Sequence, residues 1–218
     1  MGFYDDHVLP HVINLAMRNR DLLPYRKRAL AAAGGRVLEI GVGSGLNLRF
    51  YPTGVRDIVG LEPAPRLAEM ARQAAAGLSI PATFIEGSAE SIPLDSHSVD
   101  TVVTTWTLCS IPDVATALRE MRRVLKPDGQ LLFVEHGEAP EERVQKWQHR
   151  LTPIWKRIGG GCHLDRPIRA LVEGGGFAIT HLATGYMRGP KPMTFMYEGH
   201  ARPAQVSRDA LARSLLPQ

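Results

Sequence analysis

The stretch that decides the fold is Val37-Leu38-Glu39-Ile40-Gly41-Val42-Gly43-Ser44-Gly45. Its first four residues form a strand-type run, and a glycine-rich turn follows at once. Glycine adopts backbone conformations that other residues avoid, so such a turn lets the backbone approach a ligand closely. We expect a helical stretch after the turn that points its first N–H groups at that ligand. In open α/β sheets, ligands bind at this carboxyl end of the first strand.

The rest of the chain alternates between apolar runs typical of strands and segments with helical periodicity. This alternation predicts an α/β fold: a Rossmann-like, doubly wound, seven-stranded and mostly parallel sheet with helices on both faces. The predicted strands are Arg36–Ile40, Ile58–Glu62, Thr83–Glu86, Thr101–Thr105, Gln130–Glu135, Phe177–Ala183 and Met193–Tyr197. Several of them are nearly unbroken apolar runs, as expected of strands that are buried on both faces.

The clearest predicted helix lies between the fourth and fifth strands. Asp113 can cap its N-terminus, and Pro127-Asp128-Gly129 ends it. The apolar residues that recur on one of its faces are Val114, Leu118, Met121 and Leu125. Further helices are predicted at about Ala64–Ala76, 141–158 and Pro167–Glu173.

An amphipathic helix is also predicted before the first strand, from about Val8 to Leu23. Its apolar positions are Val8, Val12, Leu15 and Ala16. Because this helix has no place in the strand–helix alternation, we expect it to pack outside the sheet, over the ligand crevice. Beyond the last predicted strand, the residues from His200 are polar with scattered apolar positions, and we expect them to be partly ordered.

The composition is that of an ordinary soluble globular protein, with 44% apolar and 22% charged residues among 218. The net charge of +4 is small and the basic residues are dispersed, which argues against a nucleic-acid partner. Cys109 and Cys162 form neither a disulfide framework nor a CxxC metal motif. No apolar run approaches the roughly 20 residues of a membrane span, and acidic Asp5 and Asp6 argue against a signal peptide. We therefore expect a cytoplasmic protein without stable membrane insertion, of open oligomeric state.

The spacing of the glycines indicates the class of ligand. The dinucleotide fingerprint GxGxxG would need a third glycine at position 46, where this chain has Leu46. The chain instead has an ExGxGxG pattern that begins at Glu39, and a carboxylate suits cations better than a pyrophosphate. S-adenosylmethionine has no pyrophosphate and carries an ammonium and a sulfonium group, so it fits this turn. Glu62, which ends the second predicted strand 23 positions later, suits the ribose diol.

Three motifs within about residues 35–136 resemble the class I S-adenosylmethionine-dependent methyltransferases of the type 11 group. They are Glu39-x-Gly41-x-Gly43-x-Gly45, Gly60-Leu61-Glu62-Pro63 and Arg123-Val124-Leu125-Lys126-Pro127-Asp128-Gly129. In that family a Gly-Asp-Ala-Glu segment after the third strand holds the adenine, and this chain has Gly87-Ser88-Ala89-Glu90. The resemblance implies S-adenosylmethionine as methyl donor and S-adenosylhomocysteine as product. The predicted cofactor-binding residues are Glu39, Gly41, Gly43, Ser44, Gly45, Asn47, Glu62, Pro63, Ser88, Ala89, Glu90 and Thr104.

A narrower set of motifs is similar to the methyltransferase-like 7 proteins and their bacterial relatives. The motifs are Phe50-Tyr51-Pro52, Leu108-Cys109-Ser110, Val134-Glu135-His136, Trp147-Gln148 and Gly161-Cys162-His163-Leu164-x-Arg166. That family implies a small acceptor, often a thiol, and its animal members carry a long apolar N-terminal anchor that this sequence lacks. We accordingly divide one predicted domain, 1–218, into a lid (1–30), a cofactor-binding core (35–136) and an acceptor-side segment with the last strands (137–200).

The sequence leaves the chemical class of the methyl acceptor open. A thiol is partly ionised near neutral pH and needs little base, whereas a phenol or an amine needs a base in the site. We favour a small thiol acceptor. The alternatives are N- or O-methylation of a small metabolite or lipid amine, and a module that binds S-adenosylmethionine without catalysis.

Two histidines are the predicted catalytic and acceptor-binding residues. His136 ends the fifth predicted strand, and His163 lies in a glycine-flanked segment. The other predicted acceptor contacts are Tyr4, Trp106 and Cys109. Structural roles are the alternatives: a hydrogen-bonded His136, a loop anchor around His163, and core positions for Trp106 and Cys109. His7 and His11 are four residues apart but have no fixed third ligand beside them, so we expect no metal.

Overall fold

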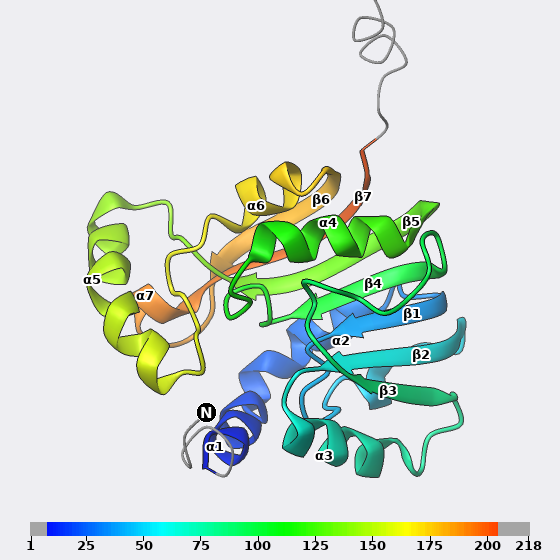
Figure 1. The fold of residues 1–218 in the computed structure, drawn as a ribbon. Helices are drawn as coiled ribbons and strands as arrows, with labels where there is room; N and C mark the ends of the chain where they lie inside the picture. Colours follow the sequence, from blue (N-terminus) through cyan, green and yellow to red (C-terminus); the bar gives the residue numbers. More distant parts are fainter. Residues whose placement is uncertain (1–7, 205–218) are drawn as a thin grey trace, which may run out of the picture.

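The apolar runs of the sequence form one seven-stranded sheet in the computed structural model, which describes residues 8–204 (Figure 1). The strands are β1 (Gly35–Ile40), β2 (Val55–Glu62), β3 (Ala82–Glu86), β4 (Val99–Thr105), β5 (Leu125–His136), β6 (Phe177–Tyr186) and β7 (Phe195–Pro203). Their order is β3-β2-β1-β4-β5-β7-β6. Strands β1 to β5 pair in parallel, and β7 pairs antiparallel with both β5 and β6. The predicted seven-stranded, mostly parallel sheet is confirmed.

Several strand boundaries differ from the prediction, most of all those of β5 and β7. Strand β5 begins at Leu125, which we had placed on the preceding helix. Leu125 is extended because it pairs with Val99, and Pro127 two residues later prevents the helix from continuing. Strand β7 begins two residues late because Lys191–Thr194 forms the short helix α7, and it then continues to Pro203. His200, which we had assigned to a polar tail, therefore lies in β7 opposite Leu132 of β5.

The helical elements include the predicted helices after the second, fourth and fifth strands, and also two that were not predicted, Leu23–Leu30 and Lys191–Thr194. They are α1 (Leu9–Met17), η2 (Arg20–Leu22), α2 (Leu23–Leu30), η3 (Leu48–Phe50), α3 (Pro65–Ala75), α4 (Val114–Val124), α5 (Glu142–Ile158), α6 (Ile168–Gly174) and α7. The helix expected directly after the glycine turn is wrong. Only the single 3-10 turn η3 forms there, because Tyr51 is extended and precedes a proline. Within residues 8–204, no helix is long and apolar enough to cross a membrane.

The sheet is buried between two layers of helices (Figure 1). On one face, α4 and α6 cover the sheet through a core cluster that includes Leu118, Met121 and Val172. On the other face, α2, η3 and α3 contribute Leu30, Leu48 and Ala71 to a second cluster. The arrowheads of β1 to β5 point toward the side on which α1 and α5 lie. The carboxyl ends of the parallel strands, where such folds bind ligands, therefore meet these two helices.

The predicted N-terminal helix is shorter than expected and packs through a different face. It ends at Met17, and Asn19 caps the following 3-10 turn by accepting a hydrogen bond from the Asp21 N–H. All four residues of the predicted apolar stripe, Val8, Val12, Leu15 and Ala16, are exposed. The buried residues of α1 are instead Leu9, Pro10 and Asn14. The stripe prediction is wrong because α1 packs around the polar side chain of Asn14.

Candidate cofactor and acceptor site

The three glycines of the turn after β1 have positive φ angles, 64° at Gly41, 57° at Gly43 and 78° at Gly45. A side chain at Gly41 would lie 2.5 Å from the Thr107 methyl carbon, and one at Gly45 would lie 3.2 Å from the Cα of Ala71. Packing therefore requires glycine at both positions. Above Gly43, in contrast, the nearest protein atom would be 3.9 Å away. Gly43 thus faces open space, into which a ligand can approach the backbone.

Glu62 at the end of β2 is tied to this turn. Its Oε2 accepts a hydrogen bond from the Gly43 N–H at 2.9 Å, and its Oε1 accepts one from the Ala64 N–H at 3.1 Å. Burial raises the pKa of Glu62, and the two backbone donors oppose that shift. Each of the two carboxylate oxygens accepts one hydrogen bond here and can accept a second. Glu62 therefore keeps capacity for two further hydroxyl donors, as a ribose diol would supply.

Glu39 is buried in a hydrogen-bond network instead of facing open space. Its Oε1 accepts from Asn47 Nδ2 at 2.7 Å, and its Oε2 accepts from the Tyr51 hydroxyl at 2.8 Å. Asn47 also donates to the Thr105 hydroxyl and accepts from Arg26 Nη1 at 2.6 Å. Burial raises the pKa of Glu39 to about 7, although Tyr51, Asn47 and Arg26 each lower it. Glu39 and Asn47 thus fix the segment that follows the turn, and this was not visible in the sequence.

The remaining predicted cofactor residues lie at the neighbouring strand ends. After β3, the Ser88 hydroxyl donates to Glu90 Oε2 at 2.8 Å, and Glu90 Oε1 accepts from the Asp113 N–H at 2.6 Å. Ala89 between them is buried in the core. Thr104 near the end of β4 is fully buried, and its hydroxyl has no partner among the described residues. Pro63 directly follows Glu62.

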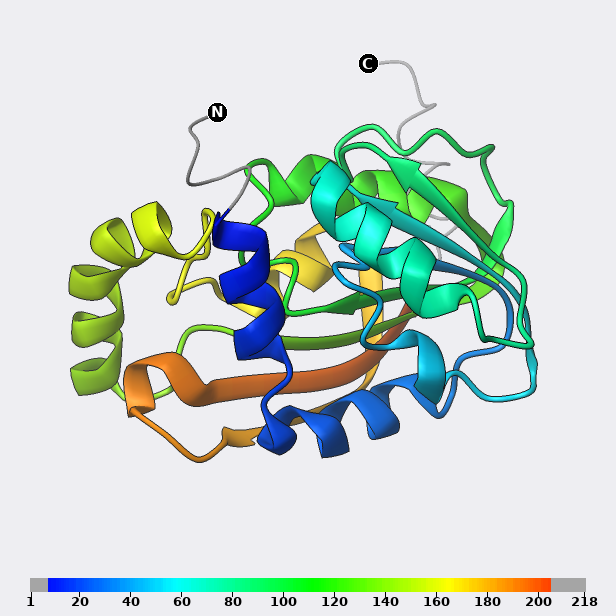
Figure 2. The same cartoon turned by 90° about the horizontal axis from the view of Figure 1, so that it is seen from below.

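Helix α1 lies against the turn and also against the segment after α5. The Ser44 hydroxyl donates to Asn14 Oδ1 at 2.7 Å. At its other side, α1 places Leu9 and Ile13 against Gly160, where an added methyl group would be 3.3 Å from Leu9. Figure 2 shows α1 in dark blue between α5 and α3, in front of the strand ends. The N-terminal helix thus bridges the two halves of the candidate site.

A second buried carboxylate organises the loop after β4. Glu135 Oε1 accepts hydrogen bonds from the Thr107 and Leu108 N–H groups at 3.0 and 3.1 Å. Burial raises the pKa of Glu135 to about 8, and negative charge on Cys109 adds to that shift. Because Thr107 packs on Gly41, this loop also touches the glycine turn. Sequence reasoning missed Glu135 and Thr107, although an acid at the end of an apolar strand was the available signal.

Trp106 begins this loop with a φ of 53°, which is unusual for a residue with a side chain. Its ring lies 4.8 Å from the guanidinium carbon of Arg26 and packs beside Val134 and Met196. The ring therefore contacts a cation and also packs in the core. Its position fits both an acceptor contact and a structural role in the core. Tyr4 and His7 lie outside the described residues.

Three of the candidate chemical groups come together beside this loop. His136 Nε2 lies 3.1 Å from Cys162 Sγ, and the donor atoms of Cys109, His136 and Cys162 are all within 4.8 Å of one another. The neighbouring Cys162 thiol lowers the pKa of Cys109 well below its usual value, and His136 contributes to that shift although burial opposes it. Burial lowers the pKa of His136, but the charges of Cys109 and Glu135 outweigh it and leave the value raised.

The segment 159–166 is fastened to the loop after β4 through backbone contacts. The His163 N–H donates to the Cys109 carbonyl oxygen at 2.9 Å. The buried Arg166 side chain donates to the Leu108 carbonyl and, at 2.6 Å, to the Ile111 carbonyl. His163 itself is partly exposed and stands apart from the three-residue cluster, and burial and Arg166 lower its pKa. Its role as a base stays a prediction, while Arg166 was not predicted.

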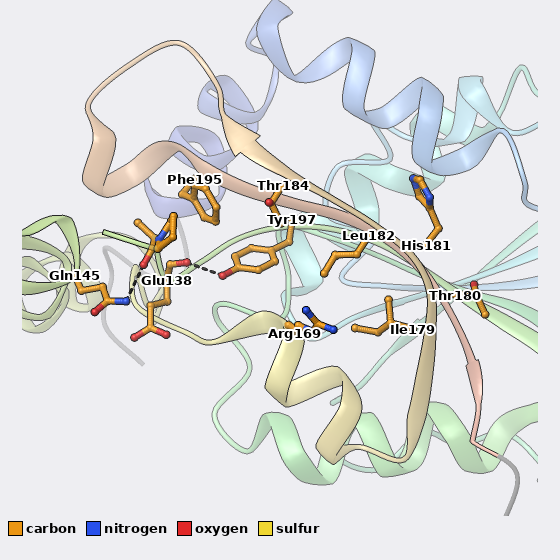
Figure 3. A pocket seen from close by; sticks show the side chains of 12 residues that line it. Glu138, Gln145, Arg169, Ile179, Thr180, His181, Leu182, Thr184, Phe195 and Tyr197 are labelled. Carbon is orange, nitrogen blue, oxygen red and sulfur yellow. Dashed lines mark hydrogen bonds between the residues drawn. The ribbon is translucent and has the colours of Figure 1, made fainter. Parts of the chain in front are cut away.

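A hollow of about 590 Å³ lies elsewhere, over the antiparallel strands β6 and β7 (Figure 3). Arg169, Leu182 and Ile179 line it, and Tyr197 donates to the Glu138 carbonyl oxygen at its rim. None of the residues predicted from the sequence lines this hollow. The chemistry-bearing residues are at the carboxyl ends of β1, β2, β4 and β5, and we place the site there.

Comparison with known proteins assigns the family. The family described as "Methyltransferase domain" matches residues 38–133. The thiol S-methyltransferase TMT1B of Homo sapiens is 33% identical over 188 residues, which cover 84% of this chain and 75% of that protein. The chain belongs to the class I S-adenosylmethionine-dependent methyltransferases. Its type 11 motifs and its similarity to the methyltransferase-like 7 group are thereby confirmed.

Two further comparisons define how far this similarity extends. The thiol S-methyltransferase TMT1B of Rattus norvegicus is 35% identical over 150 residues, and this methyltransferase chain spans 61% of its length. Among solved structures, the YcgJ protein from Bacillus subtilis superposes with a TM-score of 0.65 at 19% identity. The superposition covers 85% of this chain and 99% of the YcgJ chain. At that identity, the structural similarity shows the fold alone.

The raised pKa of Glu39 predicts a pH-dependent stability. Between pH 4.5 and about 7 the folded protein retains a proton on Glu39 that the unfolded chain has lost. Its free energy of unfolding should therefore fall as pH rises through this window, by up to about 3 kcal/mol, since one pKa unit corresponds to about 1.4 kcal/mol. In Glu39→Gln, the amide can still accept from Asn47 and donate to Tyr51, but this contribution is absent.

The measurement is urea unfolding of the native protein and of Glu39→Gln at intervals from pH 4.5 to 8. The difference between the two free energies should change across the window and level off above it. Parallel curves for the two proteins would show that Glu39 does not titrate in this range.

Proposed function

We propose that this chain transfers a methyl group from S-adenosylmethionine to the thiol of a small molecule. The observation that carries the proposal is the position of Cys109, His136 and Cys162 close to the glycine turn, which we assign to the donor. The relatives named thiol S-methyltransferase support the acceptor class.

The donor side is formed by the ends of β1, β2 and β3. The open space above Gly43 fits close approach of a ligand to the backbone, and the carboxylate of Glu62 fits the ribose hydroxyls. Ser88 and Glu90 are available at the end of β3 for the adenine. When bound, S-adenosylmethionine supplies a methyl group on a sulfonium, which an acceptor thiolate takes in an in-line displacement that leaves S-adenosylhomocysteine. The protein's task is alignment and exclusion of water.

Among the described residues, His136 lacks the orientation expected of a general base. His136 has one ring nitrogen against Cys162, and its Nδ1 is buried without a partner among the described residues. A histidine that acts as a base is normally oriented by a hydrogen-bond acceptor at its other ring nitrogen. The Nδ1 atom of His136 has no such acceptor within residues 8–204. A thiol acceptor needs little help in losing its proton, since its pKa of about 8.5 leaves a thiolate fraction at neutral pH. The arrangement therefore favours a thiol over a phenol or an amine.

The acceptor class is tested with a panel of small thiols, phenols, amines and lipid amines. The purified protein with S-adenosylmethionine should add one methyl group to thiols, detected by mass spectrometry, and should form S-adenosylhomocysteine in equal amount. Matched reactions without the protein measure the uncatalysed background. Turnover of a phenol or an amine with none of any thiol would contradict the thiol assignment, and binding without any turnover would favour a module that is not catalytic.

We further propose that α1 acts as a lid over the site. Its contacts to Ser44 on the donor side and Gly160 on the acceptor side place it across both. Lids of this kind exclude water and complete the alignment of the reacting groups. A misplacement of about 1 Å can cost roughly 10²-fold in rate, so losing the lid should be seen in turnover more than in cofactor binding.

A chain that begins at Asn19 tests the lid. Calorimetry should still detect S-adenosylhomocysteine binding, while kcat should fall by about 10²-fold or more. Val12→Ser, on the exposed face of α1, is the matched control and should leave kcat unchanged. The lid proposal is wrong if the folded truncated chain methylates at the rate of the full chain.

A further inference from the structure

The cluster of Cys109, His136 and Cys162 joins three segments that are distant in the sequence. Cys109 follows β4, His136 ends β5, and Cys162 lies in the segment after α5. Each offers one donor atom, and all three atoms lie within 4.8 Å of one another. We propose that these three side chains bind one zinc ion. Two thiolates and one imidazole are ligands that zinc prefers.

The distances fit a tetrahedral ion after small side-chain rotations. Bond lengths of about 2.3 Å to sulfur and about 2.0 Å to nitrogen place tetrahedral ligand atoms roughly 3.4–3.8 Å apart. Here His136 Nε2 and Cys162 Sγ are 3.1 Å apart, and no pair of donor atoms exceeds 4.8 Å. The three donor atoms therefore lie close enough for side-chain rotations to bring them around one ion.

The surrounding structure holds the donors in place. The His163 N–H and the Arg166 guanidinium fasten the segment that carries Cys162 to the loop that carries Cys109. Cys109 is 2% exposed and His136 is 9% exposed, so both are shielded from bulk water. The Nδ1 atom of His136 is buried without a partner among residues 8–204. Nε2, which faces Cys162, is the nitrogen that would bind the ion, and Nδ1 would still have no protein partner.

Three protein ligands leave the fourth position of a tetrahedral zinc ion open, as in catalytic zinc sites. A thiol that binds there loses its proton to solvent and binds as the thiolate. This assignment of the open position rests on the proposed function, since it identifies the acceptor as the fourth ligand. Methyl transfer then forms a carbon–sulfur bond to that thiolate as the donor's own carbon–sulfur bond breaks. Binding of the ion itself requires Cys109 and Cys162 as thiolates and releases their remaining protons.

The test is titration of the reduced full-length protein with Co²⁺ alone, followed by displacement with Zn²⁺. One Co²⁺ per chain should bind and give the intense near-ultraviolet absorption of cobalt–thiolate bonds, and Zn²⁺ should abolish it. In Cys109→Ser, Cys162→Ser and His136→Ala, the affinity should fall more than tenfold, because changing even an outer-shell partner costs about 10–100-fold. His149→Ala is the control, since this exposed histidine pairs with Asp165 outside the cluster.

Several results would overturn the site. Absence of cobalt–thiolate absorption, or retention of it in Cys162→Ser, contradicts the metal proposal, and calorimetry with S-adenosylhomocysteine shows whether each variant is folded. A reduced protein that binds no Co²⁺ but forms a Cys109–Cys162 disulfide on mild oxidation would replace the metal site with a redox pair. If Co²⁺ binds as expected but no thiol is methylated, the ion site stands and the proposed function fails. If metal-free protein methylates thiols at the full rate, the open-position role fails alone.

Discussion

Three buried carboxylates hold the loops at the carboxyl edge of the sheet, and the geometry of the site depends on them. Glu39, just before the glycine turn, accepts hydrogen bonds from Asn47 and Tyr51. Glu62 accepts from the N–H groups of Gly43 and Ala64. Glu135 accepts from the N–H groups of Thr107 and Leu108. Burial raises the pKa of all three. Burying a carboxylate is unfavourable unless hydrogen bonds compensate it, so each acid constrains the loop that supplies its donors. The glycine turn, with open space above Gly43, is one of the segments constrained in this way.

This constraint links the two sides of the site. Thr107, held by Glu135, packs on Gly41 of the turn, and two residues later Cys109 reaches His136 and Cys162. One short loop therefore links the glycine turn to the cluster of Cys109, His136 and Cys162. Because a fold does not determine its substrate, we expect the residues beyond β4 and β5 to decide the acceptor.

Local patterns in the sequence were sufficient for the sheet and the turn. The strands are apolar runs between turn residues. The ExGxGxG motif and Glu62 indicated the family because they lie close in the chain or follow adjacent strands. The cluster was not predictable in this way, since Cys109, His136 and Cys162 are brought together only by the packing of three segments. The same holds for α1. Its apolar stripe predicted the wrong buried face, because the polar contact of Asn14 with Ser44 decides how the helix packs.

We propose that Glu62 and the glycine turn bind the adenosyl group. Calorimetric titration of S-adenosylhomocysteine into Glu62→Gln tests this most directly, with Glu86→Gln as the matched control. Glu86 lies opposite Glu62 in the register of β2 and β3, but it is exposed and pairs with Arg72. Loss of a charged hydrogen-bond partner costs about 1.5–3 kcal/mol, so Glu62→Gln should weaken binding by about tenfold or more, and Glu86→Gln should bind as the native protein does. Equal affinity of the two variants and the native protein would contradict the account.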